Sequence, residues 1–461
     1  MRADEKALDE VAEHINEEYE KNLKHMTETY GYYPGTGESD RFQAAMKKAE
    51  EESEGVELPK KFNKTKKAEV YSSSEKDLKP KSKVPFIADY LKLKKAKTLR
   101  NTFANKLKSH IIDGKIHPKI TTCLDTGRVS FSKPNLQQIP RPTEDVDLRK
   151  FILPPHEGNV FYGVDNSAAE LVALGDRLVR DFGHSKMSEA INEGKDLHKL
   201  TATTVTGKKY EDITKGDRQL SKALNFGFPG GLGVRSFVNY AETSYGVKVS
   251  EEEAAKLKED WFQTYPEMRK YMKSATQNIV DKIAPFATEM KNMKAWQPYY
   301  TLKDIAAGNK VNKFGWEYTE KEIDWAWETL RMLSEKYTHV FTSFHDDIGA
   351  RKPSEDLATE IEYLRTAILP SGRIRGKCNY NNYLNNSFQG AQADIAGTAW
   401  YQLWRNGYEV AHMVHDEVQV SLPSTHFPTN EIDKIILDAA KKWCPNTTMR
   451  IESEFSPHWK K

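Results

Sequence analysis

The spacing of apolar residues along the chain predicts many helices. Residues 4–24 place their apolar side chains on one stripe, which is the repeat of an amphipathic helix. The same repeat predicts further helices over residues 40–53, 86–110, 168–182, 196–206, 216–228, 250–282, 319–337, 354–368, 386–406 and 428–443. Two polar or irregular stretches, 54–85 and 284–318, are expected to form loops.

Short apolar runs predict strands in the second and last parts of the chain. The run FYGVD at 161–165 ends in an acid, and VAHMVHDEVQVSLP at 410–423 predicts a hairpin with His-Asp-Glu at its tip. Residues 120–155, rich in Ser, Pro, Asn and Gln, are expected to be strand and loop. No repeat of fixed period is present, so the order of elements indicates an α+β fold with helical insertions.

Composition excludes several classes of protein. The 461 residues suffice for two to four units of ordinary domain size, and the 38% of hydrophobic residues can form sizeable cores. No run of 18 apolar residues and no apolar N-terminal region is present, which argues against a membrane span and a secretory signal. The three cysteines lie far apart and define no disulfide framework, so a cytoplasmic location is expected.

Charge is distributed unevenly although the net charge is only +2. Residues 1–55 hold 15 acidic and 7 basic residues, whereas residues 56–120 hold 18 basic and 6 acidic ones. A basic block of this kind indicates a polyanion partner. A solvated, lysine-rich helix face would give the same composition, and the composition alone leaves both interpretations open.

Two acids at the ends of apolar runs are the first candidate for chemistry. Asp165 follows FYGV and Asp416 follows MVH. If the two strand ends meet, their carboxylates can hold a pair of hard cations such as Mg²⁺, which serve phosphoryl transfer. Each aspartate taken singly is equally compatible with a cap or a turn.

A basic helix is the second candidate. Arg218 and Lys222 are four residues apart in DRQLSKALNFGFPGG, so they lie one turn apart on one face, and Phe226 follows on that face. Two adjacent cations can neutralise a triphosphate, and an aromatic ring can stack on a base or sugar. An ordinary amphipathic helix with a glycine-rich C-cap would have the same pattern.

A polar segment is the third candidate. The stretch TGRVSFSKPNLQQIP at 126–140 carries Arg128, Asn135, Gln137 and Gln138 with little apolar content. Such side chains form hydrogen bonds to nucleic-acid edges and sugars. A polar surface loop is the alternative.

Four motifs together resemble the family A DNA polymerases, the DNA polymerase I family. TGRVSFSKPNLQQIP resembles the stretch before motif A, and VDNSAAEL at 164–171 resembles motif A itself. RQLSKALNFG at 218–227 is similar to motif B, and VHDEV at 414–418 is similar to motif C. The motifs stand in the family's order, and the resemblance covers the chain from about residue 55 to its end.

The resemblance implies a right-hand fold with an antiparallel-sheet palm, helical fingers and a helical thumb. Its expected segments are an acidic N-terminal helical segment (1–55), a basic thumb (56–125), a first palm part with motif A (126–195), fingers with motif B and a helical insertion (196–370), and a second palm part with motif C (371–461). No segment before motif A is large enough for a proofreading exonuclease domain, and this short length suggests a phage or plasmid replication context.

The resemblance also assigns roles at the reaction centre. Asp165 and Asp416 match the aspartates that hold two Mg²⁺ ions, with a further ligand from the backbone of Asn166, and Glu417 matches a second acid of motif C. Residues matching dNTP contacts are Arg218, Lys222, Phe226, His198 and Glu170; Lys222 is also a candidate proton donor to pyrophosphate. Glu170 matches the residue that excludes ribonucleotides by crowding the sugar 2′ position.

Five further residues match contacts to the primer–template, largely in the minor groove, where correct base pairs present similar acceptors. They are Arg128, Asn135, Gln137, Gln389 and His415. The chain departs from the family pattern at Gly230, where motif B usually carries tyrosine, and at Asn381, where an arginine is frequent. These departures make the positioning of the templating base a point to examine.

The expected function is therefore DNA-templated extension of a primer with dNTPs, in DNA replication. The expected partners are primer–template DNA, dNTPs and a separate 3′–5′ exonuclease or processivity subunit. Three alternatives remain: a single-subunit RNA polymerase, the polymerase part of a split enzyme, and a DNA-binding protein without catalysis. Glu170 argues against the first, and the presence of both acids argues against the last.

Overall fold

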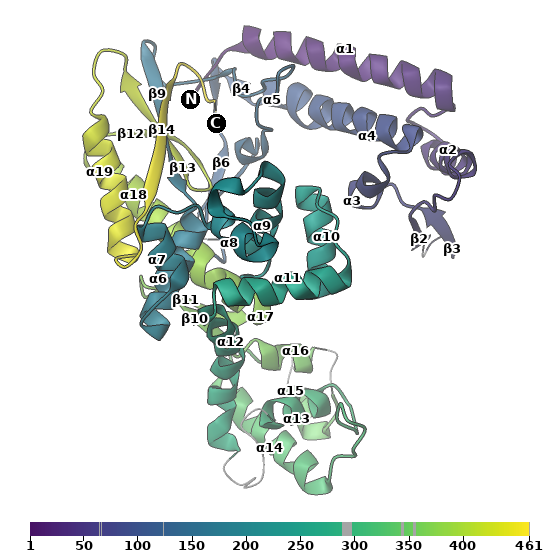
Figure 1. The fold of residues 1–461 in the computed structure, drawn as a ribbon, viewed down its shortest axis with the longest axis vertical. Coiled ribbons are helices and arrows are strands. Elements are labelled where there is room, and N and C mark those ends of the chain that lie inside the picture. Colours follow the sequence, from purple (N-terminus) through teal and green to yellow (C-terminus); the bar gives the residue numbers. More distant parts are fainter. Residues whose placement is uncertain are drawn as a thin grey trace.

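The computed structural model describes residues 1–63, 65, 67–122, 124–287, 297–342, 345–353 and 356–460. A four-stranded antiparallel sheet, which we call the central sheet, lies at the upper left of Figure 1. The strand order is β12 (Glu409–Val414), β13 (Glu417–Pro423), β9 (Asn159–Ser167) and β14 (Arg450–Ser456). Helices α18 (Ala391–Arg405) and α19 (Thr429–Trp443) pack on one face, against Val164, Val418 and Val420. The predicted strand at 161–165 and the predicted hairpin are present.

The opposite face of this sheet carries the polar side chains. Residues alternate between faces along a strand, so Asp165 and Phe161 share the face that Val164 does not. Phe161 belongs to a core with Phe131, Phe151 and Trp459, which covers this face away from the acids. The sheet is thus apolar on one side and, at one end of the other, polar.

The N-terminal residues form an arm with its own core (Figure 1). Helix α1 (Glu5–Tyr30) packs along α4 (Pro85–Thr98), and α2 (Glu38–Glu52) completes the arm. Residues 54–85 were expected to be loops, but they contain the hairpin β2 (Lys60–Asn63) and β3 (Ala68–Tyr71) and the short helix α3 (Glu75–Leu78). Their alternation is weak and mostly exposed, so the sequence pattern did not reveal the hairpin.

The acidic and basic segments of the arm neutralise one another in part. Glu20 pairs with Arg100 at 3.2 Å, and Asp9 pairs with Lys108 at 2.7 Å. Beyond α4 the helix continues through a π turn (Leu99–Ala104) into α5 (Asn105–Lys108). Short strands form two small sheets in this part of the structure. One contains β1 (Arg2–Ala3), β4 (Ile111–Ile112), β5 (Lys115–Ile116) and β8 (Ile152–Leu153), and the other pairs β6 (Lys119–Thr121) with β7 (Ser130–Ser132).

A second group of helices packs beside the sheet around Phe228, Phe237 and Trp261. It consists of α6 (Ala169–Phe182), α7 (Lys186–Asn192), α8 (Leu197–Thr206), α9 (Lys215–Gly227), α10 (Val234–Tyr245), α11 (Glu251–Thr264) and α12 (Glu267–Ile283). Capping boxes set the starts of α9 and α11, through Thr214 with Asp217 and Ser250 with Glu253. Predicted helices at 168–182, 196–206, 216–228 and 250–282 are therefore confirmed, the last as two helices.

An insertion with a separate core follows α12 at the bottom of Figure 1. It contains α13 (Gln297–Ala306), α14 (Glu320–Lys336), α15 (His345–Ala350) and α16 (Leu357–Glu362). The expectation of irregular structure over 284–318 was wrong for α13. The expected helix over 354–368 was also too long, because Arg365–Ile368 forms strand β10, paired with β11 (Ile374–Cys378).

The chain returns to the central sheet through α17 (Tyr380–Asn385) and a π turn (Asn386–Gly390) that leads into α18. Strand β14 was not expected, because its sequence RIESEFS has only two apolar residues. In the part of the chain that the structure describes, no helix is long and apolar enough to cross a bilayer.

Candidate active site

One open pocket of about 950 Å³ collects most of the residues that the motifs single out. It lies between the polar end of the central sheet and helices α6, α8 and α9. The predicted residues that line it are Arg128, Asp165, Asn166, Glu170, His198, Arg218, Lys222, Phe226, Gln389, His415 and Asp416. Asn135, Gln137 and Glu417 do not line it, although Gln137 lines an adjoining cavity with His415 and Arg128.

Two carboxylates form what we call the acid wall of the pocket, Asp165 and Asp416. Asp165 lies near the end of β9, and Asp416 lies in the turn between β12 and β13, where His415 adopts a left-handed backbone with φ of 56°. The Asp416 carbonyl accepts hydrogen bonds from the backbone and side-chain N–H groups of Asn166, at 3.4 and 3.1 Å. Strand β9 therefore fixes the turn that carries the second acid.

Like charge and burial act together on the acid wall. Burial, followed by the neighbouring Asp165 carboxylate, raises the pKa of Asp416 to about 6. The buried Oδ1 of Asn166 has no hydrogen-bond partner among the described residues. Two crowded carboxylates are a donor pair that suits hard divalent cations such as Mg²⁺.

Protein carboxylates alone do not complete such a site. Within the described ranges, no group of three or more His, Cys, Asp or Glu side chains is arranged to hold a metal. The acid wall fits cations whose remaining ligands are backbone oxygens, water or substrate phosphates, which is a common arrangement for Mg²⁺.

Glu417 lies behind the acid wall, opposite Asp165 in the β13–β9 register. Burial is the main cause that raises its pKa to about 7, and the Gln419 amide, which donates a short hydrogen bond to it, opposes that rise. Gln419 occupies the space above Gly163, where an added Cβ would lie 2.6 Å from its amide nitrogen. Gly163 and Gln419 thus hold Glu417 away from the pocket surface.

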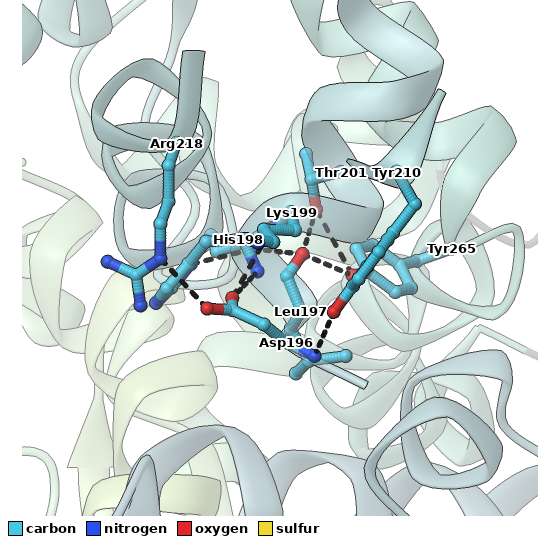
Figure 2. Close-up of polar contacts among 9 residues, drawn as sticks. Asp196, Leu197, His198, Lys199, Thr201, Tyr210, Arg218 and Tyr265 are labelled. Carbon is cyan, nitrogen blue, oxygen red and sulfur yellow. Dashed lines mark hydrogen bonds and ion pairs between the residues drawn. The ribbon is translucent and has the colours of Figure 1, made fainter. Parts of the chain in front are cut away.

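Helix α9 supplies another side of the pocket, the cation wall, formed by Arg218 and Lys222. The capping box at Thr214 starts the helix, so these two residues lie one turn apart and face the pocket with Phe226. Arg218 donates from Nε to the Asp196 carboxylate at 2.8 Å, as Figure 2 shows. Lys222 forms no ion pair with another described residue, so its charge faces the pocket uncompensated.

Asp196 has two roles at the end of the cation wall. Its Oδ1 accepts hydrogen bonds from the N–H groups of His198 and Lys199 and so caps α8, while its Oδ2 holds Arg218 (Figure 2). The Tyr210 hydroxyl accepts a hydrogen bond from the Asp196 N–H at 2.8 Å. One carboxylate therefore couples the start of α8 to the position of Arg218.

His198 lies buried between α8 and α9. Its Nδ1 is 3.1 Å from the Asn225 amide nitrogen, and its ring centroid lies 5.5 Å from that of Phe226. Burial is the main cause that lowers the pKa of His198 to about 4. At neutral pH the positive charge of this side of the pocket therefore comes from Arg218 and Lys222.

Glu170 and Arg128 are paired with each other. Glu170, in the first turn of α6, accepts a short hydrogen bond from Arg128, which also donates to Gln392 at 2.9 Å. Gln392 in turn donates to the His415 carbonyl at 3.3 Å. Three predicted residues far apart in sequence are thus linked by Gln392, which the motifs did not single out.

The two departures from the family pattern touch each other. The Asn381 amide donates to the Gly230 carbonyl at 2.7 Å. A Cβ at Gly230 would lie 2.6 Å from the side chain of Asn385, one turn along α17. Asn381 and Asn385 therefore fill the space beside Gly230, which has no side chain of its own.

Sequence reasoning missed several residues of the site. Asp196 and Gln392 act through contacts with partners distant in sequence, and Gln419 is hidden inside a predicted strand. Arg450 and Glu452 also line the pocket, from the unexpected strand β14, and Glu452 lies opposite Asp165 in register. The signal that could have identified Asp196 is its place as an N-cap before a predicted helix.

Comparison with known proteins identifies the fold. The chain has the fold of the POL domain of Pol1 from M. smegmatis, solved in complex with DNA primer-template and dNTP: the TM-score is 0.65 at 20% identity, over 100% of this chain and 67% of that one. The expected right-hand fold with an antiparallel palm sheet is thereby confirmed.

Sequence comparison gives the same family. DNA polymerase I of Aquifex aeolicus is 35% identical over 230 residues, which are 49% of this chain and 38% of that protein. DNA polymerase I of Helicobacter pylori strain J99 is 32% identical over 200 residues, or 43% of this chain and 20% of that protein. The chain thus spans less than two fifths of these relatives. A sequence model of DNA polymerase family A matches residues 8–309. The chain belongs to DNA polymerase family A.

Proposed function

We propose that the protein is a DNA-templated DNA polymerase that extends a primer 3′-hydroxyl with dNTPs and releases pyrophosphate. The observation that carries this proposal is the pocket itself, because the acid wall and the cation wall line one and the same space. An acid pair suits divalent cations and a cation pair suits a triphosphate, so the two walls together suit a metal-bound nucleotide. Family membership and the shared fold support the same activity.

The acid wall would hold two Mg²⁺ ions through Asp165, Asp416 and the backbone of Asn166. When bound, these ions activate the attacking hydroxyl and stabilise charge on the phosphates. Glu417, held by Gln419 behind the wall, supports the position of the acids from β13. At the acid wall the protein itself supplies oxygen ligands that are held at a fixed spacing.

The cation wall would bind the nucleotide. Arg218, oriented by Asp196, and Lys222 neutralise the triphosphate, and Lys222 can deliver a proton to the departing pyrophosphate. His198 adds a neutral hydrogen-bonding group, and Phe226 packs on the sugar and base. Glu170, held by Arg128, would exclude a 2′-hydroxyl.

Primer–template DNA would be held by Arg128, Asn135, Gln137, Gln389 and His415. In the structure Arg128 is engaged by Glu170 and Gln392, so DNA contact requires this arginine to exchange or share partners. Gln389 lies in the π turn before α18, and a π turn of this kind is common at functional sites. The cytoplasmic location, the phage context and a separate exonuclease or processivity subunit stay predictions.

Primer extension tests the proposal. The full chain is incubated with Mg²⁺, a labelled primer–template and either dNTPs or rNTPs, beside Asp165→Ala. We expect extension with dNTPs only, and none by the variant. Extension with rNTPs at an equal rate would favour an RNA polymerase. DNA binding without extension by the parent would instead favour a split enzyme or a protein that only binds DNA.

A further inference from the structure

The insertion after α12 displays a hairpin of aromatic and basic side chains, which we call the aromatic hairpin, residues 310–318. In the part of the chain that the structure describes, Trp316 is the most exposed large apolar side chain, at 72%, and Phe314 is exposed to 65%. Neither ring belongs to the buried core of the insertion. Two neighbouring exposed rings mark a candidate interaction surface.

The backbone of the aromatic hairpin is fixed. The Asn312 side chain accepts hydrogen bonds from the N–H groups of Phe314 and Trp316, at 2.9 and 3.1 Å. The backbone N–H of Asn312 donates to the Trp316 carbonyl at 2.9 Å. Gly315 supplies the left-handed turn with φ of 81°. The Tyr318 hydroxyl donates to Asp304 of α13 at 2.6 Å and anchors the base. The rings therefore need little further ordering to bind a ligand.

Positive charge lies among the rings. The ammonium of Lys313 is 5.0 Å from the Phe314 ring centroid and 5.2 Å from that of Tyr300, which is itself partly exposed. The Phe314 and Trp316 centroids are 6.3 Å apart. Lys310 is exposed at the start of the hairpin, so two lysines accompany the rings against the single acid Glu317.

The insertion is connected firmly to the helices of the pocket. Helix α12 places Ala275 in the core of the helical group and Ile279 in the core of the insertion. Arg365 donates to the Ala275 carbonyl at 2.8 Å, and the Thr366 N–H donates to the Asn278 side chain at 2.9 Å. Helix α12 therefore joins the core of the insertion to the core that contains residues of α9.

We propose that the aromatic hairpin binds unpaired bases of the single-stranded template ahead of the active site. Exposed rings offer stacking that any base can use, and neighbouring lysines meet the phosphates, which is the chemistry of sequence-independent single-strand binding. The proposal rests on the proposed function, because a templated polymerase is what presents a single strand to this surface. Lysine is depleted at protein–protein interfaces, so Lys313 beside the rings favours a nucleic acid over a protein partner.

A pair of matched double variants tests this. Phe314→Ser with Trp316→Ser removes both rings, and Tyr401→Ser with Trp404→Ser is the control. The control rings, on α18, are 54% and 64% exposed with centroids 6.1 Å apart, and no lysine ammonium of the described residues lies over either ring. Both variants alter exposed side chains, so both should fold, which circular dichroism verifies.

The readout is binding of a fluorescent oligothymidine to the full chain, measured by anisotropy. Loss of stacking should weaken binding about tenfold or more in the hairpin variant and leave the control near the parent. Lys313→Gln should lower the slope of log affinity against log salt by about one. On primer–templates, the hairpin variant should lose the affinity that a long template overhang adds, and keep its affinity for a blunt duplex.

Three results would overturn the proposal: equal oligothymidine affinity in parent and hairpin variant, an equal loss in both double variants, or an unchanged affinity with a shift from dimer to monomer. The last would mean that the surface joins two copies of the chain. Oligothymidine binding that depends on the hairpin, in a chain that extends no primer, would instead refute the proposed function and leave the hairpin site standing.

Discussion

The acid wall and the cation wall face the same pocket but are built differently. Asp165 and Asp416 come from a strand and a turn that meet only through folding, and their charges oppose each other. Arg218 and Lys222 come from one helix, and one of them is already paired with Asp196. The acids are thus assembled at an electrostatic cost, whereas the cations are placed by local helix geometry.

This difference indicates which part of the site depends on a bound ligand. Like charges in a partly buried space destabilise the protein until a cation separates them, which is a common feature of functional sites. The cation wall needs less compensation, because Asp196 balances Arg218 and His198 stays neutral. Metal should therefore stabilise the acid wall, while substitutions at the cation wall should act mainly on nucleotide binding.

The largest expected effect comes from Asp416→Asn, which removes one charge of the acid wall. Loss of a metal ligand should lower the rate of primer extension at least about a thousandfold. The same change relieves repulsion, so the free protein should melt at a higher temperature than the parent. Single-turnover extension and thermal melts with and without Mg²⁺ measure both effects.

The control for this experiment is Asp438→Asn, which changes an exposed acid paired with Lys434 at 2.6 Å. Exposed pairs contribute little, so extension and melting should stay near the parent. Mg²⁺ should raise the melting temperature of the parent and of Asp438→Asn, and leave that of Asp416→Asn unchanged. An equal rise in all three proteins would show that the acid wall is not where the cation binds.

A second prediction concerns the packing next to the cation wall. Gly230→Ala would bring a Cβ within 2.6 Å of Asn385, and overpacking should lower the free energy of unfolding by about 1–3 kcal/mol. Adding Asn385→Ala should recover part of that loss. Urea unfolding provides the measurement. Gly397→Ala, in the open interior of α18, should instead stabilise the protein by about 0.5–1 kcal/mol. A neutral Gly230→Ala would mean that Asn385 can move freely aside.

The sequence predicted those parts of the site that depend on local periodicity. Arg218, Lys222 and Phe226 follow from helical spacing once α9 is recognised, and Asp165 follows from a short apolar run that ends in an acid. The acids meet as expected because β9 and β13 pair directly. The roles of these residues came from the resemblance to the family. Their spacing alone was also compatible with an ordinary amphipathic helix and an ordinary turn.

The rest could not be predicted because it depends on pairing between distant segments. Gln392 joins Arg128 across 264 residues, and no local pattern marks such a contact. Strand β14 has too few apolar residues to be predicted, because it lies at the edge of the sheet and most of its side chains are exposed. The predicted helix over 354–368 wrongly included strand β10, because no glycine or proline separates its four residues from α16.

A third prediction distinguishes the effect of a buried histidine of the sheet on stability from the effect of the acid wall. His412 on β12 is fully buried, and its ring centroid lies 5.3 Å from that of Phe131 and 4.6 Å from that of Trp459. Burial lowers the pKa of His412 to about 3. Neither ring nitrogen has a hydrogen-bond partner among the described residues. In the unfolded chain His412 binds a proton near pH 6.5, whereas in the folded chain it stays neutral down to about pH 3. The contribution of His412 to stability is therefore full above pH 6.5 and falls as the pH decreases toward 3.

His412→Phe should remove this contribution. At pH 5 the variant should be more stable than the parent by about 2 kcal/mol, from about 1.4 kcal/mol per pH unit, and the difference should shrink at pH 8. Denaturant unfolding at the two pH values measures it. A difference of the same size at both pH values would assign the effect to packing, and acid sensitivity would then belong to the acid wall.

The smallest expected effect tests whether the cation wall needs its carboxylate. Asp196→Asn keeps an oxygen to cap α8 but loses the charge that holds Arg218, so the KM for dNTP should rise about three- to tenfold with kcat unchanged. Asp196→Ala also loses the cap and should lower stability by about 1 kcal/mol. Steady-state kinetics and thermal melts distinguish the two variants. If the asparagine variant keeps the parent KM while the alanine variant only melts earlier, Asp196 serves the helix alone, and the cation wall is placed by α9 without help.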